Sequence, residues 1–212
     1  MSRPSRNIDV ALLRAGRQLY PAAGVRGLSV RSVAERAGVN LGMFHYHFRS
    51  KDAFVRALLS EMYNGMFGDL TLAAGDARPV EALRNALLVL ARFARDNRRA
   101  LRRILLDALD DEPVAREFIS TNMPRHVGVI LGLVKAGQRS GGLRKLAPTQ
   151  ALAFAAGAVA APILLGTLIT EHRDSPDAVR RAFERSVLAD PALAQRVDLV
   201  IAALCKPRGA KS

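Results

Sequence analysis

Apolar residues in this chain recur at helical spacing from one end to the other, and this periodicity constrains its fold more than any other feature. Residues three, four and seven positions apart share one face of an α-helix, whereas a half-buried strand alternates every second residue. No alternating run of Val, Ile and Thr is bracketed by Asn-Gly or Asp-Gly turns. The sequence therefore predicts an all-α protein.

Four helices are predicted near the N-terminus. They cover about residues 8–23, 30–37 and 41–48, with a fourth that begins at residue 51. Ser29, Asn40 and Ser50 precede the last three helices, and short polar side chains of this kind cap helix N-termini. Gly24 and Gly38 follow the first two helices, where glycine readily adopts the left-handed conformation that ends a helix.

Longer helices rich in Leu and Ala are predicted after a stretch at residues 74–79 that contains Gly, Asp and Pro. Their approximate limits are residues 80–96, 98–110, 113–138, 148–172, 176–189 and 191–205. The change of composition predicts two domains, residues 1–56 and 57–206, joined through the fourth helix. Residues 207–212 are predicted to be a disordered tail.

The chain carries a strong positive charge that is concentrated at its N-terminus. It has 32 Lys and Arg residues against 19 Asp and Glu residues, a formal net charge of +13. Residues 1–56 contain ten of the basic and three of the acidic residues, a net charge of +7. A field of this sign favours polyanions or anionic membrane surfaces as partners.

Cysteine usage and the N-terminal residues predict a cytoplasmic protein. The single cysteine, Cys205, cannot form an internal disulfide, which fits a reducing compartment. The first residues are basic, but the amphipathic stretch at residues 10–20 lacks the apolar core of a secretory signal. We therefore expect no secretory signal.

One uncharged segment is near the length of a membrane span. Residues 151–169 are 19 consecutive residues without a charge. They are dominated by Ala and Gly, which favour hydrocarbon only weakly, and they include Pro162. This composition favours a helix buried in a bundle or in a subunit interface over a membrane span.

A helix-turn-helix pattern lies between about residues 29 and 48. A short helix, the turn Gly38-Val39-Asn40 and a second helix follow one another. Gly38 permits the turn, and Val39 fills the angle between the two helices. The second helix of such a pair enters the major groove of DNA. The alternative is a plain helical hairpin, which is common in all-α proteins.

The N-terminal stretch resembles the tetracycline-repressor (TetR) family of bacterial one-component transcription regulators. The agreement extends over about residues 8–56 and rests on many positions in one order and spacing. These positions are Gly24, Ser29, Val33-Ala34, Ala37-Gly38-Val39, Asn40-Leu41-Gly42, His47-Phe48 and Ser50-Lys51. The resemblance implies an N-terminal helix-turn-helix DNA-binding domain and a larger C-terminal helical bundle for dimerisation and ligand binding.

The resemblance also assigns DNA contacts to individual residues. Base edges are expected to meet Leu41, Gly42, Met43, Tyr46 and, from the preceding helix, Arg31. Phosphates are expected to meet Ser29, His45, His47 and Lys51, and the expected DNA-binding set is completed by Ser32 and Asn40. Many family members have Tyr at the position of His45 and Thr at that of Met43, so apolar contacts are expected for Met43.

The neighbouring imidazoles of His45 and His47 raise the alternative of a metal site. Residues i and i+2 lie about 200° apart on a helix, whereas on a strand they share a face. A helical segment therefore excludes a shared ion. We expect neither a metal nor another cofactor.

The C-terminal helices are expected to form a homodimer and to hold a small-molecule effector. A helix-turn-helix makes few base contacts alone, and a symmetric operator calls for a twofold dimer. The interface candidates are the small-residue helix at residues 151–170 and the last helix at residues 192–204. The expected ligand-binding residues are Arg103, Asp107, Asn122, Arg125 and His126. Arg103 and Asp107 are also four residues apart, as in an ordinary solvated salt bridge.

The sequence therefore predicts a repressor that binds a palindromic operator and is released by an effector. No enzyme activity is expected, because motifs such as G-x-S-x-G, H-E-x-x-H and the P-loop do not occur. The alternatives are a helical DNA-binding regulator without ligand response, an all-α enzyme, and a membrane-associated or RNA-binding helical protein. Salt-sensitive binding to duplex DNA with a sequence-specific remainder distinguishes a regulator from the others.

Overall fold

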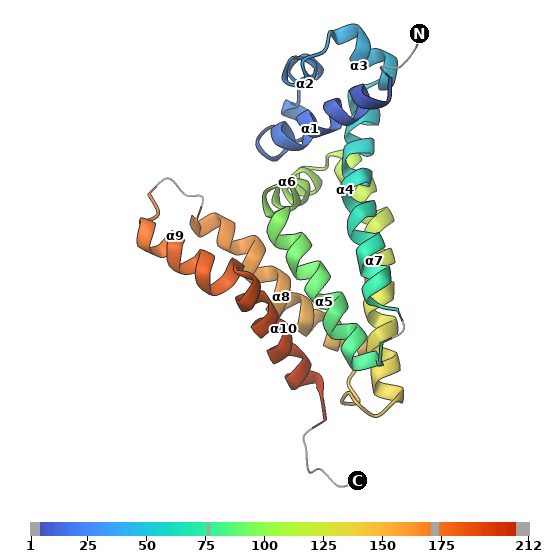
Figure 1. Ribbon diagram of the computed structural model, residues 1–212, viewed down its shortest axis with the longest axis vertical. Coiled ribbons are helices and arrows are strands. Elements are labelled where there is room, and N and C mark those ends of the chain that lie inside the picture. Colours follow the sequence, from blue (N-terminus) through green and yellow to red (C-terminus); the bar gives the residue numbers. More distant parts are fainter. Residues whose placement is uncertain (1–4, 76, 171–173, 207–212) are drawn as a thin grey trace. The chain divides into compact units, whose positions relative to one another are not determined.

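The chain is built of helices throughout residues 5–75, 77–170 and 174–206, which a computed structural model describes (Figure 1). No strand occurs in these ranges, where Leu143 and Cys205 form an isolated bridge, so the all-α prediction is confirmed. The predicted tail at residues 207–212 and the end of the helix predicted at residues 148–172 lie outside the described residues. The elements are α1 (Ser5–Gly27), α2 (Val30–Ala37), α3 (Leu41–His47), α4 (Lys51–Ala73), α5 (Pro79–Asp96), α6 (Arg98–Leu109), α7 (Pro113–Arg139), α8 (Pro148–Thr170), α9 (Asp177–Phe183), the π-helical segment η1 (Glu184–Leu188) and α10 (Asp190–Leu204).

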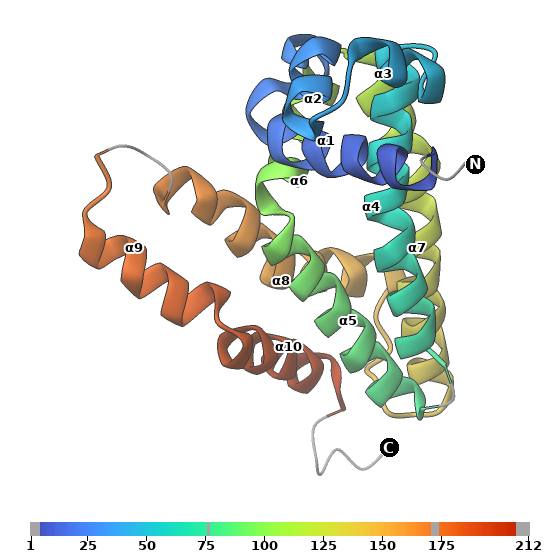
Figure 2. The same cartoon turned by 45° about the horizontal axis from the view of Figure 1, so that its top comes forward.

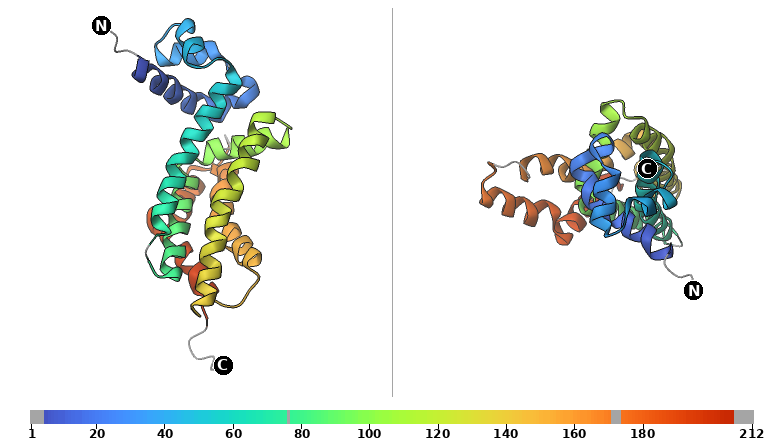
Figure 3. Two further views of the ribbon diagram at one scale, coloured as in Figure 1. Left: turned by 90° about the vertical axis from the view of Figure 1, so that its right-hand side faces the viewer. Right: turned by 90° about the horizontal axis from the view of Figure 1, so that it is seen from above.

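These helices form two compact units. The first contains residues 1–65 and 99–122, and the second contains residues 66–98 and 123–212. A boundary at residue 56, as the sequence suggested, would fall inside α4, which Figure 3 shows as one unbroken helix. Residues 99–122, which hold most of α6 and the start of α7, join the N-terminal residues although they lie far from them in the sequence.

α1 breaks at Gly24. Its backbone angles there, φ 64° and ψ −173°, lie in a region that only glycine enters readily. The predicted end of the first helix is confirmed at this residue, and one further turn continues to Gly27. A Cβ atom at position 24 would collide with the guanidinium group of Arg103 and stand 2.7 Å from Asp107 Oδ1. Close packing is thus a second reason for glycine here.

Side-chain caps begin α2, α3 and α4 as predicted. Ser29 Oγ, Asn40 Oδ1 and Ser50 Oγ each accept a hydrogen bond from the backbone N–H three residues on, at 3.4, 2.9 and 3.1 Å. Gly38 ends α2 in the left-handed conformation, with φ 70°. These local bonds fix both sides of the turn between α2 and α3.

Aromatic rings fill the core of the first unit. Phe44 of α3 and Phe54 of α4 are fully buried, with ring centroids 5.2 Å apart, and the Phe48 ring lies 5.0 Å from that of Phe54. Gly16 of α1 lies so close that a Cβ atom would stand 2.6 Å from the Phe54 ring. α3 is therefore held by the face that carries Phe44, and its opposite face points outward.

α5, α8 and α10 pack against one another in the second unit (Figure 2). Their inward faces carry buried apolar side chains, among them Leu83, Ile163 and Val197. Arg84 of α5 donates two hydrogen bonds to the carboxylate of Asp198 on α10, at 2.5 and 3.2 Å. The three helices thus form a small bundle with a polar link at its edge.

α8 buries one face and exposes the other. Four apolar residues at helical spacing are buried, namely Ala151, Ala155, Val159 and Ile163. Its exposed stripe contains Phe154, Gly157, Leu165 and Leu168. One stretch of the described chain, Pro148–Gly166, is long and apolar enough to cross a membrane, and 28% of this apolar stretch is buried. Of the two expected environments, a bundle or a subunit interface, the chain itself provides the first, and it does so for one face of α8.

We expect Gly24→Ala to destabilise the first unit by about 2–4 kcal/mol, because the methyl group adds backbone strain to a collision with a buried ion pair. Urea unfolding of the purified chain measures this loss. Gly38→Asn is the matched control, since Gly38 also has a positive φ but no atom lies within 4 Å of its Cβ position, and Asn tolerates this conformation. Equal losses for the two variants would contradict close packing at Gly24.

Candidate nucleic-acid interface

α3 has one face in the core and one in solvent. Phe44 is 0% exposed, whereas Tyr46 is 76% exposed and Leu41 is 42% exposed. Among the other residues predicted to contact DNA from this helix, His45 and Gly42 are exposed and Met43 is half-buried. Aromatic and apolar side chains that gather on an exposed face in this way mark a surface that meets a partner.

The N-terminal turn of α2 presents polar side chains. The exposed residues here are Ser29, Arg31 and Ser32. Arg31 was predicted to reach a base edge, and in the structure it pairs with Glu35 at 3.0 Å on the surface of α2. An exposed pair of this kind is worth about 0.3–0.5 kcal/mol, so Arg31 can exchange Glu35 for a base or a phosphate at little cost.

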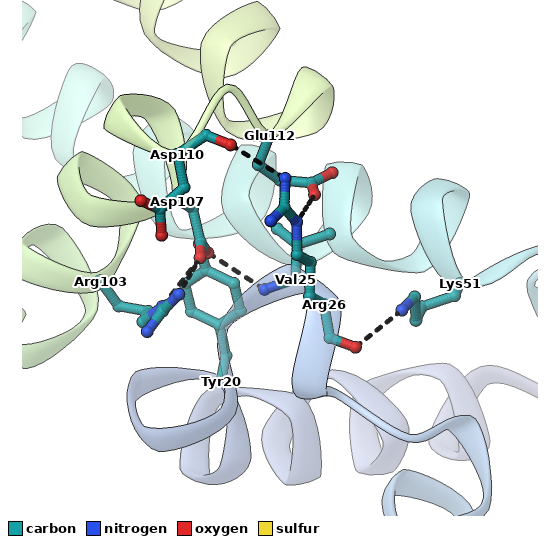
Figure 4. Close-up of polar contacts among 8 residues, drawn as sticks. All are labelled: Tyr20, Val25, Arg26, Lys51, Arg103, Asp107, Asp110 and Glu112. Carbon is teal, nitrogen blue, oxygen red and sulfur yellow. Dashed lines mark hydrogen bonds and ion pairs between the residues drawn. The ribbon is translucent and has the colours of Figure 1, made fainter.

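Lys51 opens α4 and lies against the end of α1. Its ammonium group donates a hydrogen bond to the carbonyl oxygen of Arg26 at 3.2 Å (Figure 4). The ammonium group has two further hydrogens, and the N-terminal amides of α4 add positive charge nearby. Lys51 can therefore bind an anion from a defined position.

The helical geometry of α3 separates His45 from His47. Both residues lie within the helix, which directs their side chains about 200° apart. His45 is exposed, whereas His47 is half-buried and its Nε2 atom has no hydrogen-bond partner in the described chain. Among the described residues, no group of three or more His, Cys, Asp and Glu is placed to hold a metal ion.

A buried carboxylate joins α6 to α1 (Figure 4). Asp107 is 2% exposed, and its Oδ2 atom accepts hydrogen bonds from the Tyr20 hydroxyl at 2.9 Å and from the Val25 N–H at 3.0 Å. Its Oδ1 atom accepts a hydrogen bond from Arg103 Nε at 2.8 Å. Arg103 and Asp107 therefore form the expected salt bridge. The prediction that water solvates this pair was wrong, because α1 covers the carboxylate.

Tyr20 and Arg103, the two hydrogen-bond donors whose side chains bind Asp107, have raised pKa values. Burial, followed by the nearby Asp107 carboxylate, raises the pKa of Tyr20 well above its usual range. The hydrogen bond to Asp107 is the main cause that raises the pKa of Arg103. Tyr20 therefore remains a hydrogen-bond donor, and Arg103 remains charged, at any pH at which proteins normally fold.

Arg26 makes a second link between α1 and the turn that follows α6. Its guanidinium group donates to the Asp110 carbonyl oxygen at 2.9 Å and to Glu112 Oε2 at 3.3 Å (Figure 4). Sequence reasoning missed Tyr20, Arg26 and Glu112 as partners, because each of these bonds joins residues more than 80 positions apart. Helical periodicity carries no signal for such pairs.

The residues predicted to bind a ligand are divided between the two units. Arg103, Asp107 and Asn122 belong to the first, and Arg125 and His126 belong to the second. The backbone carbonyl of Asn122 accepts a hydrogen bond from the Tyr63 hydroxyl at 2.8 Å. The Arg125 guanidinium group lies 4.2 Å from the centroid of the Phe67 ring, within the range of a cation–π contact. A ligand-binding role for these residues remains a prediction.

Comparison with known families decides where this helix-turn-helix belongs. Residues 12–58 match the family described as bacterial regulatory proteins, tetR family. The chain's helix-turn-helix is that of a tetR-family protein. The match covers α2, α3 and their caps, together with the parts of α1 and α4 that pack around them.

Curated relatives with a helix-turn-helix are similar to this chain. The chain is 24% identical over 131 residues to the probable HTH-type transcriptional regulator YttP of Bacillus subtilis (strain 168), which is 60% of this chain and 63% of YttP. It is 30% identical over 67 residues to the HTH-type transcriptional repressor KstR2 of Mycolicibacterium smegmatis, 32% of each chain. The matched parts thus span less than two thirds of these relatives.

The likeness in fold extends beyond the part that the sequence comparisons cover. The structure of the ketosteroid transcriptional regulator KstR2 of Mycobacterium tuberculosis matches with a TM-score of 0.66 and covers 98% of both chains. The sequence identity is 16%, so this likeness concerns the fold alone.

We expect Phe44→Ala to cost about 3–5 kcal/mol of unfolding free energy, because it leaves a cavity in the aromatic core. Tyr46→Ala, two positions along the same helix, is expected to stay within about 0.5 kcal/mol of the parent, because the ring is exposed. Chemical unfolding followed by circular dichroism compares the two. A large loss for Tyr46→Ala would mean that this ring supports the fold and does not belong to an interface.

Proposed function

We propose that this chain is a transcriptional repressor that binds a palindromic operator in double-stranded DNA as a homodimer, and that a small-molecule effector releases it. The proposal rests on the geometry of α3. Asn40 caps this helix, Phe44 is buried in the core, and Tyr46 on the other face is exposed. The relatives YttP and KstR2, named as a transcriptional regulator and a transcriptional repressor, support the same class of function.

In the proposed complex, α3 enters the major groove. Apolar side chains on its outer face suit thymine methyl groups, and Arg31 suits the acceptor atoms of guanine. The base-reading residues are Leu41, Gly42, Met43, Tyr46 and Arg31, and the backbone is met by Ser29, Ser32, Asn40, His45, His47 and Lys51. The net charge of +7 in residues 1–56 adds the electrostatic attraction on which DNA binding depends.

The exposed stripe of α8 is the proposed centre of the dimer. Phe154, Leu165 and Leu168 lie on one side of this helix and are 47%, 61% and 55% exposed in the part of the chain that the structure describes. α10 contributes Leu199, which is exposed while Val197 and Val200 beside it are buried. Two copies that join through such faces in a twofold arrangement bury the apolar surface of both.

The effector is proposed to act through α4. This helix begins at Lys51 in the first unit and continues without a break to Ala73 in the second. An effector held in the second unit by residues such as Arg125 and His126 would displace α4, change the separation of the two reading helices and make them lose their register with the half-sites.

The proposal places the protein in the cytoplasm, at the nucleoid, and assigns it no catalytic step. It assigns the apolar stripe of α8 to a second copy of the chain and not to a membrane, because the opposite face of α8 packs on α5 and α10. A free second copy offers the same stripe, so the two surfaces match by symmetry.

Protection mapping on the DNA upstream of the gene tests this function. Two protected half-sites with centres about 34–36 Å apart, or a multiple of that spacing, are expected, as is binding that weakens with salt but keeps a sequence-specific part. Salt-sensitive binding without sequence preference would contradict the proposal. If no candidate effector releases the DNA, the chain is a regulator without ligand response.

Tyr46→Ala is expected to weaken operator binding at least about tenfold, since a base contact is worth about 1–3 kcal/mol and each dimer loses two. A fluorescence-anisotropy titration with the protected duplex measures the affinity. Ser60→Ala, at an exposed site on α4 outside the proposed contact set, serves as the control. Unchanged affinity for Tyr46→Ala would remove this residue from the interface.

Leu165→Asp is expected to convert the dimer into a monomer at micromolar concentration, because it puts a charge into the apolar centre of the proposed interface. Sedimentation velocity gives the mass of the particle. Leu72→Asp is the matched control, since Leu72 is an exposed leucine of the second unit that lies on α4. A dimer that survives Leu165→Asp and dissociates with Leu72→Asp would place the interface elsewhere.

A further inference from the structure

We propose that Asp107 is a positioning residue for DNA binding: from α6 it holds the last turn of α1, residues 24–27, which leads to α2, and through this turn it sets the positions of Ser29 and Lys51. This inference rests on the proposed function, because it concerns how the DNA-facing groups are held. None of the residues in the network is among those that read bases.

The first support is the way in which the Asp107 carboxylate is satisfied. Two of its four bonds come from α1, through the hydroxyl of Tyr20 at 2.9 Å and the N–H of Val25 at 3.0 Å. The others come from Arg103 on its own helix, through Nε at 2.8 Å and through a short contact of Nη2. A buried carboxylate with this many charge-assisted bonds tolerates little movement of its donors.

The second support is the break in α1 at Gly24. Beyond this residue, the Val25 N–H turns to the Asp107 side chain for its acceptor. No Cβ atom fits between this turn and the Arg103–Asp107 pair, so the backbone itself is in contact with α6. Asp107 of α6 thus takes the place of the helical hydrogen-bond acceptor at the break in α1.

The third support is the link from this turn to the phosphate-facing groups. Arg26 follows Val25, and its side chain is bound to the Asp110 carbonyl oxygen and to Glu112. Its own carbonyl oxygen accepts the hydrogen bond from the Lys51 ammonium group at 3.2 Å. Three residues later comes Ser29, the N-cap of α2. A shift of this turn would therefore move Ser29 and Lys51, two of the predicted phosphate contacts; Figure 4 shows the bond to Lys51.

Tyr20→Phe tests the inference, because it removes one hydrogen bond to Asp107 and keeps the ring. The probe is a duplex that the full-length parent protein selects from a random-sequence pool. We expect about tenfold weaker binding by folded protein. We also expect the slope of log affinity against log salt to fall by about 2, since each lost phosphate contact accounts for about 0.9 and a dimer has two Lys51 residues.

Tyr63→Phe is the matched control. Tyr63 is also buried in the first unit and also donates a hydroxyl hydrogen bond over a long sequence distance, at 2.8 Å, but to the Asn122 carbonyl oxygen and away from the α1–α2 turn. It should lower stability to a similar extent and leave both affinity and salt slope unchanged. Equal effects of the two variants on affinity, after correction for the folded fraction, would overturn the positioning role.

Hydrogen exchange of the free protein gives a readout that does not depend on DNA. Faster exchange of the amides at residues 25–32 in Tyr20→Phe, and not in Tyr63→Phe, is expected. Unchanged exchange there would overturn the inference even if DNA binding is found. If the parent protein selects no duplex, the proposed function fails, and the exchange result still decides whether Asp107 positions the turn. Asp107→Asn, where it folds, should exceed Tyr20→Phe in both measurements.

Discussion

The first unit depends on one requirement, that the carboxylate of Asp107 be fully paired where water does not reach it. A buried charge left without partners costs several kcal/mol, so the helices around it must bring donors to it. Arg103 supplies charge from the same helix, and Tyr20 and the Val25 N–H supply hydrogen bonds from α1. This requirement accounts for the glycine at position 24 and for the grouping of residues 99–122 with the N-terminal residues.

The two surfaces that we propose as partner sites share one pattern: one face of the helix is buried in the core, and the opposite face is exposed. α3 is held by Phe44 and exposes Tyr46, and α8 is held by Ile163 and exposes Leu165. Leaving apolar surface in water forgoes about 25 cal/mol for each Å² that could be buried. The polar and basic surroundings of α3 agree with the proposed DNA groove, and the uncharged stripe of α8 agrees with the proposed second copy of the chain.

Much of the interface geometry was predictable because the interactions are local. The caps at Ser29 and Asn40 act over three residues, and the left-handed Gly38 ends α2 within one turn. The exposure of Tyr46 beside the buried Phe44 also follows from helical spacing alone. The DNA contacts themselves remain predictions, since Lys51 and Arg31 bind groups of the protein in this structure.

The sequence by itself determined the helices, their caps, the turn between α2 and α3 and the resemblance of its helix-turn-helix to the tetR family, because capping and periodicity act within a window of a few residues. Only the tertiary structure decided that Asp107 is buried and that one face of α8 is exposed to solvent. Arg103 and Asp107 form the same i, i+4 pair whether water or α1 covers them. Which distant face provides that cover depends on how whole helices pack, and no short stretch of sequence contains that information.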